Sequence, residues 1–131
     1  MTRVLALDHG AARCGAAVSD PSGTLATPLT TIPRPDSPRG LEAIADLVRE
    51  TGAELVVVGL PLTLRGDEGR QAAAARAFAG RVAKAAGVPV ELHDERLTTS
   101  HATRTGGSAG EDERAAAHIL ESWLESRRVK G

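Results

Sequence analysis

Acidic residues stand at three places where a strand or a helix is expected to begin or end. Asp8 follows the apolar residues 4–7, Glu95 follows an apolar run that ends at His93, and Asp112 opens the last helical pattern. A carboxylate at the end of a buried strand loses much of its water, so a hydrogen bond, a cation or a metal must compensate its charge. Ligands of open α/β sheets collect at the carboxyl ends of strands. We therefore expect these acids to converge.

Converging carboxylates repel one another unless a cation joins them. Because all the donor atoms of Asp8, Glu95 and Asp112 are oxygens, Mg²⁺ or Mn²⁺ suits them better than Zn²⁺. Such a centre can activate water and stabilise the charge that develops when a phosphodiester is displaced in line. The three acids therefore predict a metal centre for phosphodiester hydrolysis.

Each acid also has a simpler explanation. An Asp at the end of a strand is often only a turn former, and Glu95 beside Arg96 is compatible with an ordinary surface ion pair. The acidic residues 111–113 are what any helix N-terminus prefers, because the helix dipole is positive there.

The histidines show no metal-ligand spacing, and the sequence leaves open whether His9 or His93 assists the acids. Cys14 lies inside an apolar strand pattern, which indicates a buried filler more than a nucleophile. As the single cysteine it cannot form an internal disulfide, which fits a reducing cytoplasm.

Length and composition narrow the possible functions. The chain of 131 residues fits one domain over 1–131, and no run of apolar residues is long enough to span a membrane. The net charge of −1 does not indicate a polyanionic partner, so any nucleic-acid binding must rest on a local group of arginines. With aromatics at 2%, there is no stacking platform of the RRM or OB type.

The elements that must position the acids follow from periodicity and turn signals. Short connections favour an antiparallel unit of three strands, and the later strands alternate with helices, which implies parallel pairing. The expected strands are residues 3–8, 14–20, 24–32, 55–58 and 88–93. The expected helices are one that ends at 51–52, one over 67–86, a short one over 97–105 and one over 111–127, with a flexible loop at 106–110. The predicted fold is α/β, with a five-stranded mixed sheet of three antiparallel and two parallel strands flanked by helices.

Four blocks of the sequence together resemble the motifs of one family, the YqgF/RuvX family of RNase H-like proteins. The members of that family are described as Holliday junction resolvases and as pre-16S rRNA nucleases. The matching blocks occur in order and span nearly the whole chain: residues 7–10 with Arg13, Gly15 and 17–20; residues 57–62 with Gly66, 68–69 and Gln71; residues 94–99; and Asp112 with 115–116 and 119–120.

The resemblance implies an RNase H-like nuclease domain and assigns roles within it. Asp8, Glu95 and Asp112 would be the acidic triad that binds the metal. The nucleic-acid backbone would be met by Arg13, Arg65, Arg70 and Arg96. The turn at 59–61 would let the backbone approach the substrate closely. One departure is Ala12, where the family often has Lys.

The predicted function is therefore a metal-dependent nuclease, with the 5′ end of pre-16S rRNA as the favoured target in ribosome biogenesis. RNA is favoured as the substrate, branched DNA is the alternative, and a monomer is expected more than a dimer. An actin-like ATPase would need two such domains and an adenosine pocket. A non-catalytic RNA-binding assembly factor would gain nothing from three carboxylates facing a polyanion, because without metal they repel it.

Overall fold

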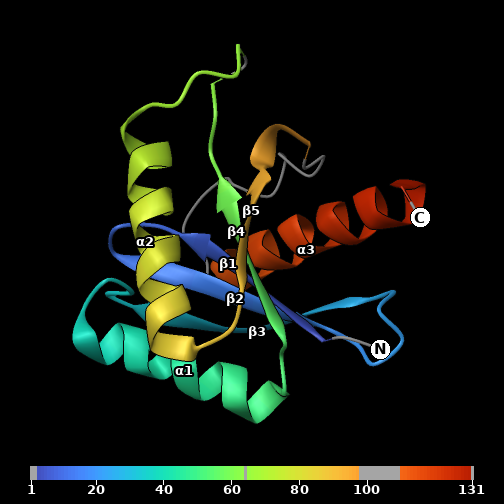
Figure 1. The fold of residues 1–131 in the computed structure, drawn as a ribbon, viewed down its shortest axis with the longest axis horizontal. Coiled ribbons are helices and arrows are strands. Elements are labelled where there is room, and N and C mark those ends of the chain that lie inside the picture. The colour runs from blue at the N-terminus through green and yellow to red at the C-terminus, as the bar shows by residue number, and fades with distance from the viewer. Residues whose placement is uncertain (1–2, 64, 98–109, 131) are drawn as a thin grey trace.

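The structure, a computed structural model, describes residues 3–63, 65–97 and 110–130. Its elements are β1 (Val4–His9), β2 (Arg13–Ser19), β3 (Ala26–Pro33), α1 (Pro38–Thr51), β4 (Leu55–Leu60), α2 (Arg70–Ala86), β5 (Val90–Asp94), the 3₁₀ turn η1 (Glu95–Leu97) and α3 (Glu111–Lys130). The strands form one sheet in the order β3-β2-β1-β4-β5 (Figure 1).

The predicted mixture of pairings is confirmed. β1 pairs antiparallel with β2, and β2 pairs antiparallel with β3. β4 pairs parallel with β1, and β5 pairs parallel with β4. The carboxyl ends of β1, β4 and β5 therefore lie at one end of the sheet.

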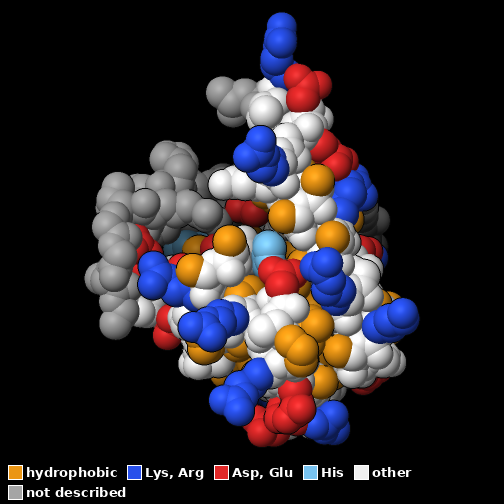
Figure 2. All heavy atoms as spheres, turned by 90° about the vertical axis from the view of Figure 1, so that its left-hand side faces the viewer, with side chains coloured by type: hydrophobic (Ala, Val, Ile, Leu, Met, Phe, Trp, Pro, Cys, Tyr) orange, Lys and Arg blue, Asp and Glu red, His pale blue; other side chains and the backbone are white. Residues whose placement is uncertain are grey.

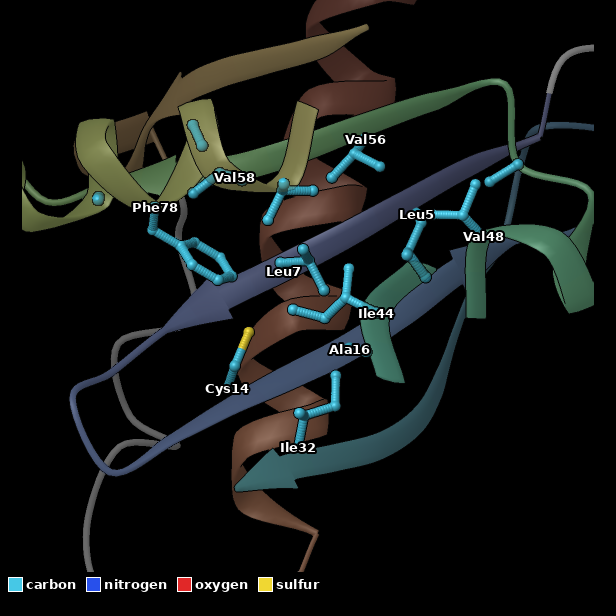
Figure 3. Close-up of a cluster of buried hydrophobic side chains, with 14 of the residues drawn as sticks. Leu5, Leu7, Cys14, Ala16, Ile32, Ile44, Val48, Val56, Val58 and Phe78 are labelled. Carbon is cyan, nitrogen blue, oxygen red and sulfur yellow. The ribbon is translucent and has the colours of Figure 1, made fainter. Parts of the chain in front are cut away.

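Helices cover both faces of the sheet: α1 and α2 lie on one face and α3 on the other (Figure 1). The first core lies between the sheet and the α1–α2 layer. Every second side chain of the strands points into it and packs against side chains of the two helices (Figure 3). Its central side chains include Leu7, Val58, Ile44 and Phe78, all fully buried. Burial of each such side chain contributes about 1.5–3 kcal/mol. A second core lies under α3 and includes Ala6, Val57 and Ile119.

The second long helix begins later than the sequence predicts. Helix α2 starts at Arg70 and not at Asp67, because the preceding residues form a turn of their own. Leu62 bridges Glu68, and the Thr63 N–H donates to the Asp67 carbonyl at 3.0 Å. Backbone groups that are paired in this turn cannot start a helix.

Other boundaries move by two or three residues. Strand β3 starts at Ala26 because the Asp20 carboxylate accepts hydrogen bonds from the backbone N–H groups of Thr24 and Leu25, each at 2.8 Å. Most of the short helix expected over 97–105 and of the loop over 106–110 lies outside the described residues. None of the described helices has the length and apolar character needed to cross a membrane.

Candidate active site

Asp8 faces the α3 side of the sheet because side chains alternate along a strand. Leu5 and Leu7 belong to the core under α1 and α2, and Val4 and Ala6 belong to the core under α3. With a period of two, Asp8 continues the α3-facing row, and it lies next to the end of β1. Its partial exposure leaves the carboxylate accessible at this end of the sheet.

The start of α3 lies directly on β2 at Gly15. A Cβ atom at Gly15 would be 1.9 Å from the carbonyl oxygen of Asp112, so only a residue without a side chain allows this approach. Gly15 is the antiparallel partner of Asp8. Gly15 on β2 therefore allows Asp112 to lie beside Asp8 on the neighbouring strand β1.

A second glycine accommodates Glu95, which begins η1 just after β5. A Cβ atom at Gly59 would be 2.8 Å from the Glu95 Oε2 atom and 2.7 Å from the Ile119 Cδ1 atom. Leu7 is aligned with Val58 in the parallel register, so Gly59 follows at the same end of the sheet as Asp8. The Glu95 carboxylate thus reaches across β4 towards β1.

The three acids line one cavity of about 470 Å³ at this end of the sheet. Its wall also carries Arg13 from β2, and Arg70 with Gln71 from the first turn of α2. The cavity thus lies between the N-terminal ends of α2 and α3, over the carboxyl ends of β1 and β4. The structure places five of the predicted site residues around one space: Asp8, Arg13, Arg70, Glu95 and Asp112.

Arg13 forms an ion pair with one of the acids. Its Nε donates to the Asp112 Oδ2 at 2.8 Å, and the two side chains are 57% and 36% exposed. Ion pairs this exposed are worth about 0–1 kcal/mol, because water screens them. Asp112 can therefore exchange this partner for another cation at little cost.

The chemistry of the donor set fits a hard divalent cation. The three carboxylates supply only oxygen ligands, and Gly15 and Gly59 make the room that brings two of them to the cavity. Over residues 3–63, 65–97 and 110–130, no three His, Cys, Asp or Glu side chains are already close enough to hold a metal ion. Binding would require the carboxylates to draw closer together, and a cation would compete with Arg13 for Asp112.

Two of the predicted arginines do not line this cavity. Arg96 donates from Nε and Nη2 to the Asp94 carboxylate, at 2.7–3.1 Å, and these hydrogen bonds hold the pKa of Asp94 below its ordinary value. Its guanidinium also lies against the turn before α2, where a Cβ at Gly66 would be 3.1 Å from Nη1. Arg65 is exposed on the same turn.

His9 lines the cavity, but its ring is engaged on the opposite side of the sheet from the acids. It stacks on Phe78 with 4.3 Å between ring centroids, and its Nε2 lies 2.7 Å from the Asp36 Oδ2. Asp36 also accepts from Arg81 Nη1 at 2.9 Å. The spacing of the sequence does not predict the trio of His9, Asp36 and Arg81, because these residues come from β1, the β3–α1 connection and α2.

His93 and Cys14 are buried structural residues. The His93 Nε2 lies 2.8 Å from the Ser122 Oγ under α3, and burial lowers the pKa of this imidazole. Cys14 is fully buried in the first core, where burial raises the pKa of its thiol and the charge of Asp8 adds to that effect. A thiol that stays protonated is a poor nucleophile, in agreement with its prediction as a filler.

Comparisons with known proteins identify the family that this chain resembles. The family model described as "RuvX: Holliday junction resolvase" matches residues 2–126. A Rhodococcus erythropolis protein is 44% identical over 95% of this chain and 78% of its own length, and a Chloroflexus aggregans protein is 43% identical over 95% and 94%. Both bear the name "Putative pre-16S rRNA nuclease".

A solved structure shares the fold at low sequence identity. It is titled "T. thermophilus RuvC in complex with Holliday junction substrate", and it superposes with a TM-score of 0.62 at 18% identity, over 98% of this chain and 96% of that one. This likeness establishes the RNase H-like architecture of the sheet and helices.

Proposed function

Because this chain belongs to the RuvX family, we propose that it is a metal-dependent nuclease that hydrolyses phosphodiester bonds in RNA and processes the 5′ end of pre-16S rRNA. The observation that carries this proposal is the gathering of Asp8, Glu95 and Asp112, with Arg13 and Arg70, around one cavity. Carboxylates serve to hold a cation, and arginines serve to hold a phosphate.

Asp8, Glu95 and Asp112 would hold Mg²⁺ or Mn²⁺ in this cavity. A bound divalent cation supplies the charge that activates water and stabilises the phosphorane-like transition state. The chain contributes the positioning of the carboxylates: β1 fixes Asp8, and the packing of α3 on Gly15 fixes Asp112. Once an ion has drawn the carboxylates together, ligands held by the sheet and by α3 would need little further reorganisation during the reaction.

The basic residues of the cavity would orient the substrate phosphate. Arg70 opens α2 and lies with Gln71 in its first turn, where backbone N–H groups and the helix dipole also favour an anion. Arg13, once Asp112 leaves it, has a planar guanidinium that can bind a phosphate through two hydrogen bonds. These contacts hold the backbone without reading the bases.

RNA is preferred over a four-way DNA junction in this proposal. Symmetric cleavage of a junction needs two active sites related by a two-fold axis, and hence a stable dimer. The exposed large apolar side chains of the described residues are Leu25 and Leu29, at 65% and 37% exposed, which is little for such an interface. A cytoplasmic monomer with one acidic site suits cutting RNA ends.

A side-by-side cleavage assay tests this function. An RNA carrying the extended 5′ end of 16S rRNA and a mobile four-way DNA junction are incubated at matched salt with Mg²⁺, Mn²⁺, Ca²⁺ or excess EDTA. We expect cleavage of the RNA with Mg²⁺ or Mn²⁺ and little with Ca²⁺, since the larger ion relaxes the ligand geometry.

Three other outcomes would each contradict the proposal. Symmetric paired nicks in the junction, with the RNA left intact, would favour a resolvase. Tight RNA binding without cleavage under any metal condition would favour a non-catalytic assembly factor. Full activity in EDTA would rule out the acidic metal centre.

A further inference from the structure

A second cavity lies between the end of β3 and the start of α1. Its volume is about 650 Å³, and its wall includes Arg34, Ser37 and Arg39. Unlike the first cavity, its lining contains no Asp or Glu. It is therefore a basic cavity with no internal charge compensation.

Neither guanidinium of this cavity has a carboxylate partner among residues 3–63, 65–97 and 110–130. The acid nearest in sequence, Asp36, is already held by His9 and by Arg81. Because Arg34 and Arg39 stay strongly charged at any physiological pH, the cavity offers two uncompensated positive charges to an anion.

The second cavity adjoins the candidate active site through the β1–β2 turn. The Arg34 N–H donates to the Ala12 carbonyl at 2.9 Å, and Pro33 is the antiparallel partner of Arg13. Arg13 lines the first cavity and Pro33 and Arg34 line the second. A chain molecule leaving the acidic site over this turn would meet Arg34 next.

Figure 2 shows one face of the molecule, on which Lys and Arg side chains lie below and beside the central histidine with Asp and Glu side chains among them. The position of Arg34 is set by the backbone. Its φ is 46°, and Gly40 packs so closely that a Cβ there would be 2.2 Å from the Arg34 carbonyl oxygen. The turn that presents Arg34 is thus defined by packing, and its guanidinium remains exposed.

We propose that Arg34 and Arg39 form a second phosphate-binding site, which holds the backbone of the same RNA strand beyond the bond that is cut. The inference rests on the proposed function and adds the path of the substrate across the protein. With no aromatic side chain in the cavity, the site binds phosphate and does not stack or read bases.

The test compares RNA strands of increasing length on the wild-type protein and on the double variant Arg34→Gln/Arg39→Gln. Affinity is measured by fluorescence anisotropy in Ca²⁺ across a salt series. For long strands, the slope of log affinity against log salt should become shallower by about 1.4, at about 0.7 for each lost contact to a single strand. Strands too short to leave the first cavity should bind both proteins equally.

The double variant Arg49→Gln/Lys84→Gln is the matched control. It removes the same charge from the last turns of α1 and α2, away from both cavities. An unchanged slope in the Arg34/Arg39 variant, or an equal change in the control, would overturn the second site. Because Arg34 has a positive φ, the single variant Arg34→Gly also removes the guanidinium without backbone strain, and it should lower the slope by about half as much.

This design separates the second site from the proposed function. If the wild-type protein shows the length-dependent salt slope but cuts no RNA with Mg²⁺ or Mn²⁺, the nuclease proposal fails and the phosphate site stands. If it cuts RNA but the slope is insensitive to Arg34 and Arg39, the phosphate site fails and the nuclease proposal stands.

Discussion

Two residues without side chains make room for two of the three carboxylates. Gly15 admits the start of α3, which carries Asp112, and Gly59 admits the Glu95 side chain. A larger residue at either glycine position would push Asp112 or Glu95 away from the end of the sheet. The distribution of charge in the cavity therefore depends as much on these glycines as on the acids.

Removing one carboxylate charge should abolish most of the activity and leave the fold intact. Mutating residues that only orient metal ligands lowers metal affinity or activity by about 10–100-fold. Loss of a ligand itself should cost more, so we expect Asp8→Asn, Glu95→Gln and Asp112→Asn each to lower kcat/KM by at least about a hundredfold. Glu111→Gln is the control, because it lies in the same turn of α3 but does not line the cavity. A folded Asp8→Asn protein that cleaves RNA at the wild-type rate would contradict the assignment.

Arg13 should compete with the metal for Asp112. In Arg13→Ala the ion pair is absent, so we expect tighter Mn²⁺ binding in isothermal titration calorimetry, by a factor of about 2–5 for a pair worth up to about 1 kcal/mol. Arg70→Ala removes the same charge from the same cavity without breaking an ion pair to Asp112, and it should have a smaller effect. Equal or weaker Mn²⁺ binding in Arg13→Ala would show that the ion pair does not compete.

Among the elements, β4 approaches α3 at Gly59, next to the Ile119 side chain. In Gly59→Ala the new methyl group would contact Ile119 and Glu95, so we expect a loss of about 1–3 kcal/mol in unfolding free energy and a fall in activity as the carboxylate moves. Gly80→Ala is the matched control in α2, where a Cβ meets nothing within 4 Å. It should raise stability by up to about 1 kcal/mol. Both are measured by urea denaturation, and an unaltered Gly59→Ala protein would contradict this packing.

The contact between β5 and α3 should make stability depend on pH. Burial lowers the pKa of His93 in the folded protein, so the unfolded chain binds the proton more readily. The stabilisation is fully present above the ordinary histidine pKa of about 6.5 and is lost as pH falls below it.

The measurement is the melting temperature between pH 7.5 and pH 5. The melting temperature of the wild-type protein should fall further between pH 7.5 and pH 5 than that of His93→Gln. His118→Gln is the control, because that histidine lies on the surface of α3 beside Glu121. Parallel curves for the wild-type protein and His93→Gln would contradict a buried, neutral His93.

For the whole molecule, the sequence was sufficient to predict the architecture but not the side-chain pairing at its edge. The five strands and their mixed pairing are confirmed, because alternating and continuous apolar runs depend on burial, which the sequence records directly. The start of α2 was wrong because a local turn at 62–68 competes with the helix. The Arg13–Asp112 pair and the His9–Asp36–Arg81 trio depend on tertiary contacts that no spacing records.

The roles given to the site residues, and the single domain over 1–131, stay predictions. The sequence placed Asp8 and Glu95 at strand ends, and the structure adds that they share a cavity with Asp112, Arg13 and Arg70. The second basic cavity was not foreseen, because Arg34 and Arg39 belong to no motif and become neighbours only through the turn into α1.

A crystal structure of the wild-type protein with Mn²⁺ would show whether the three acids hold a metal ion, because the anomalous signal locates the ion without reference to activity. We predict a peak in the first cavity within about 2.0–2.4 Å of carboxylate oxygens from Asp8, Glu95 and Asp112, with Arg13 turned away from Asp112. A fully occupied Mn²⁺ elsewhere, with the Arg13–Asp112 ion pair intact and no peak among the three acids, would contradict it.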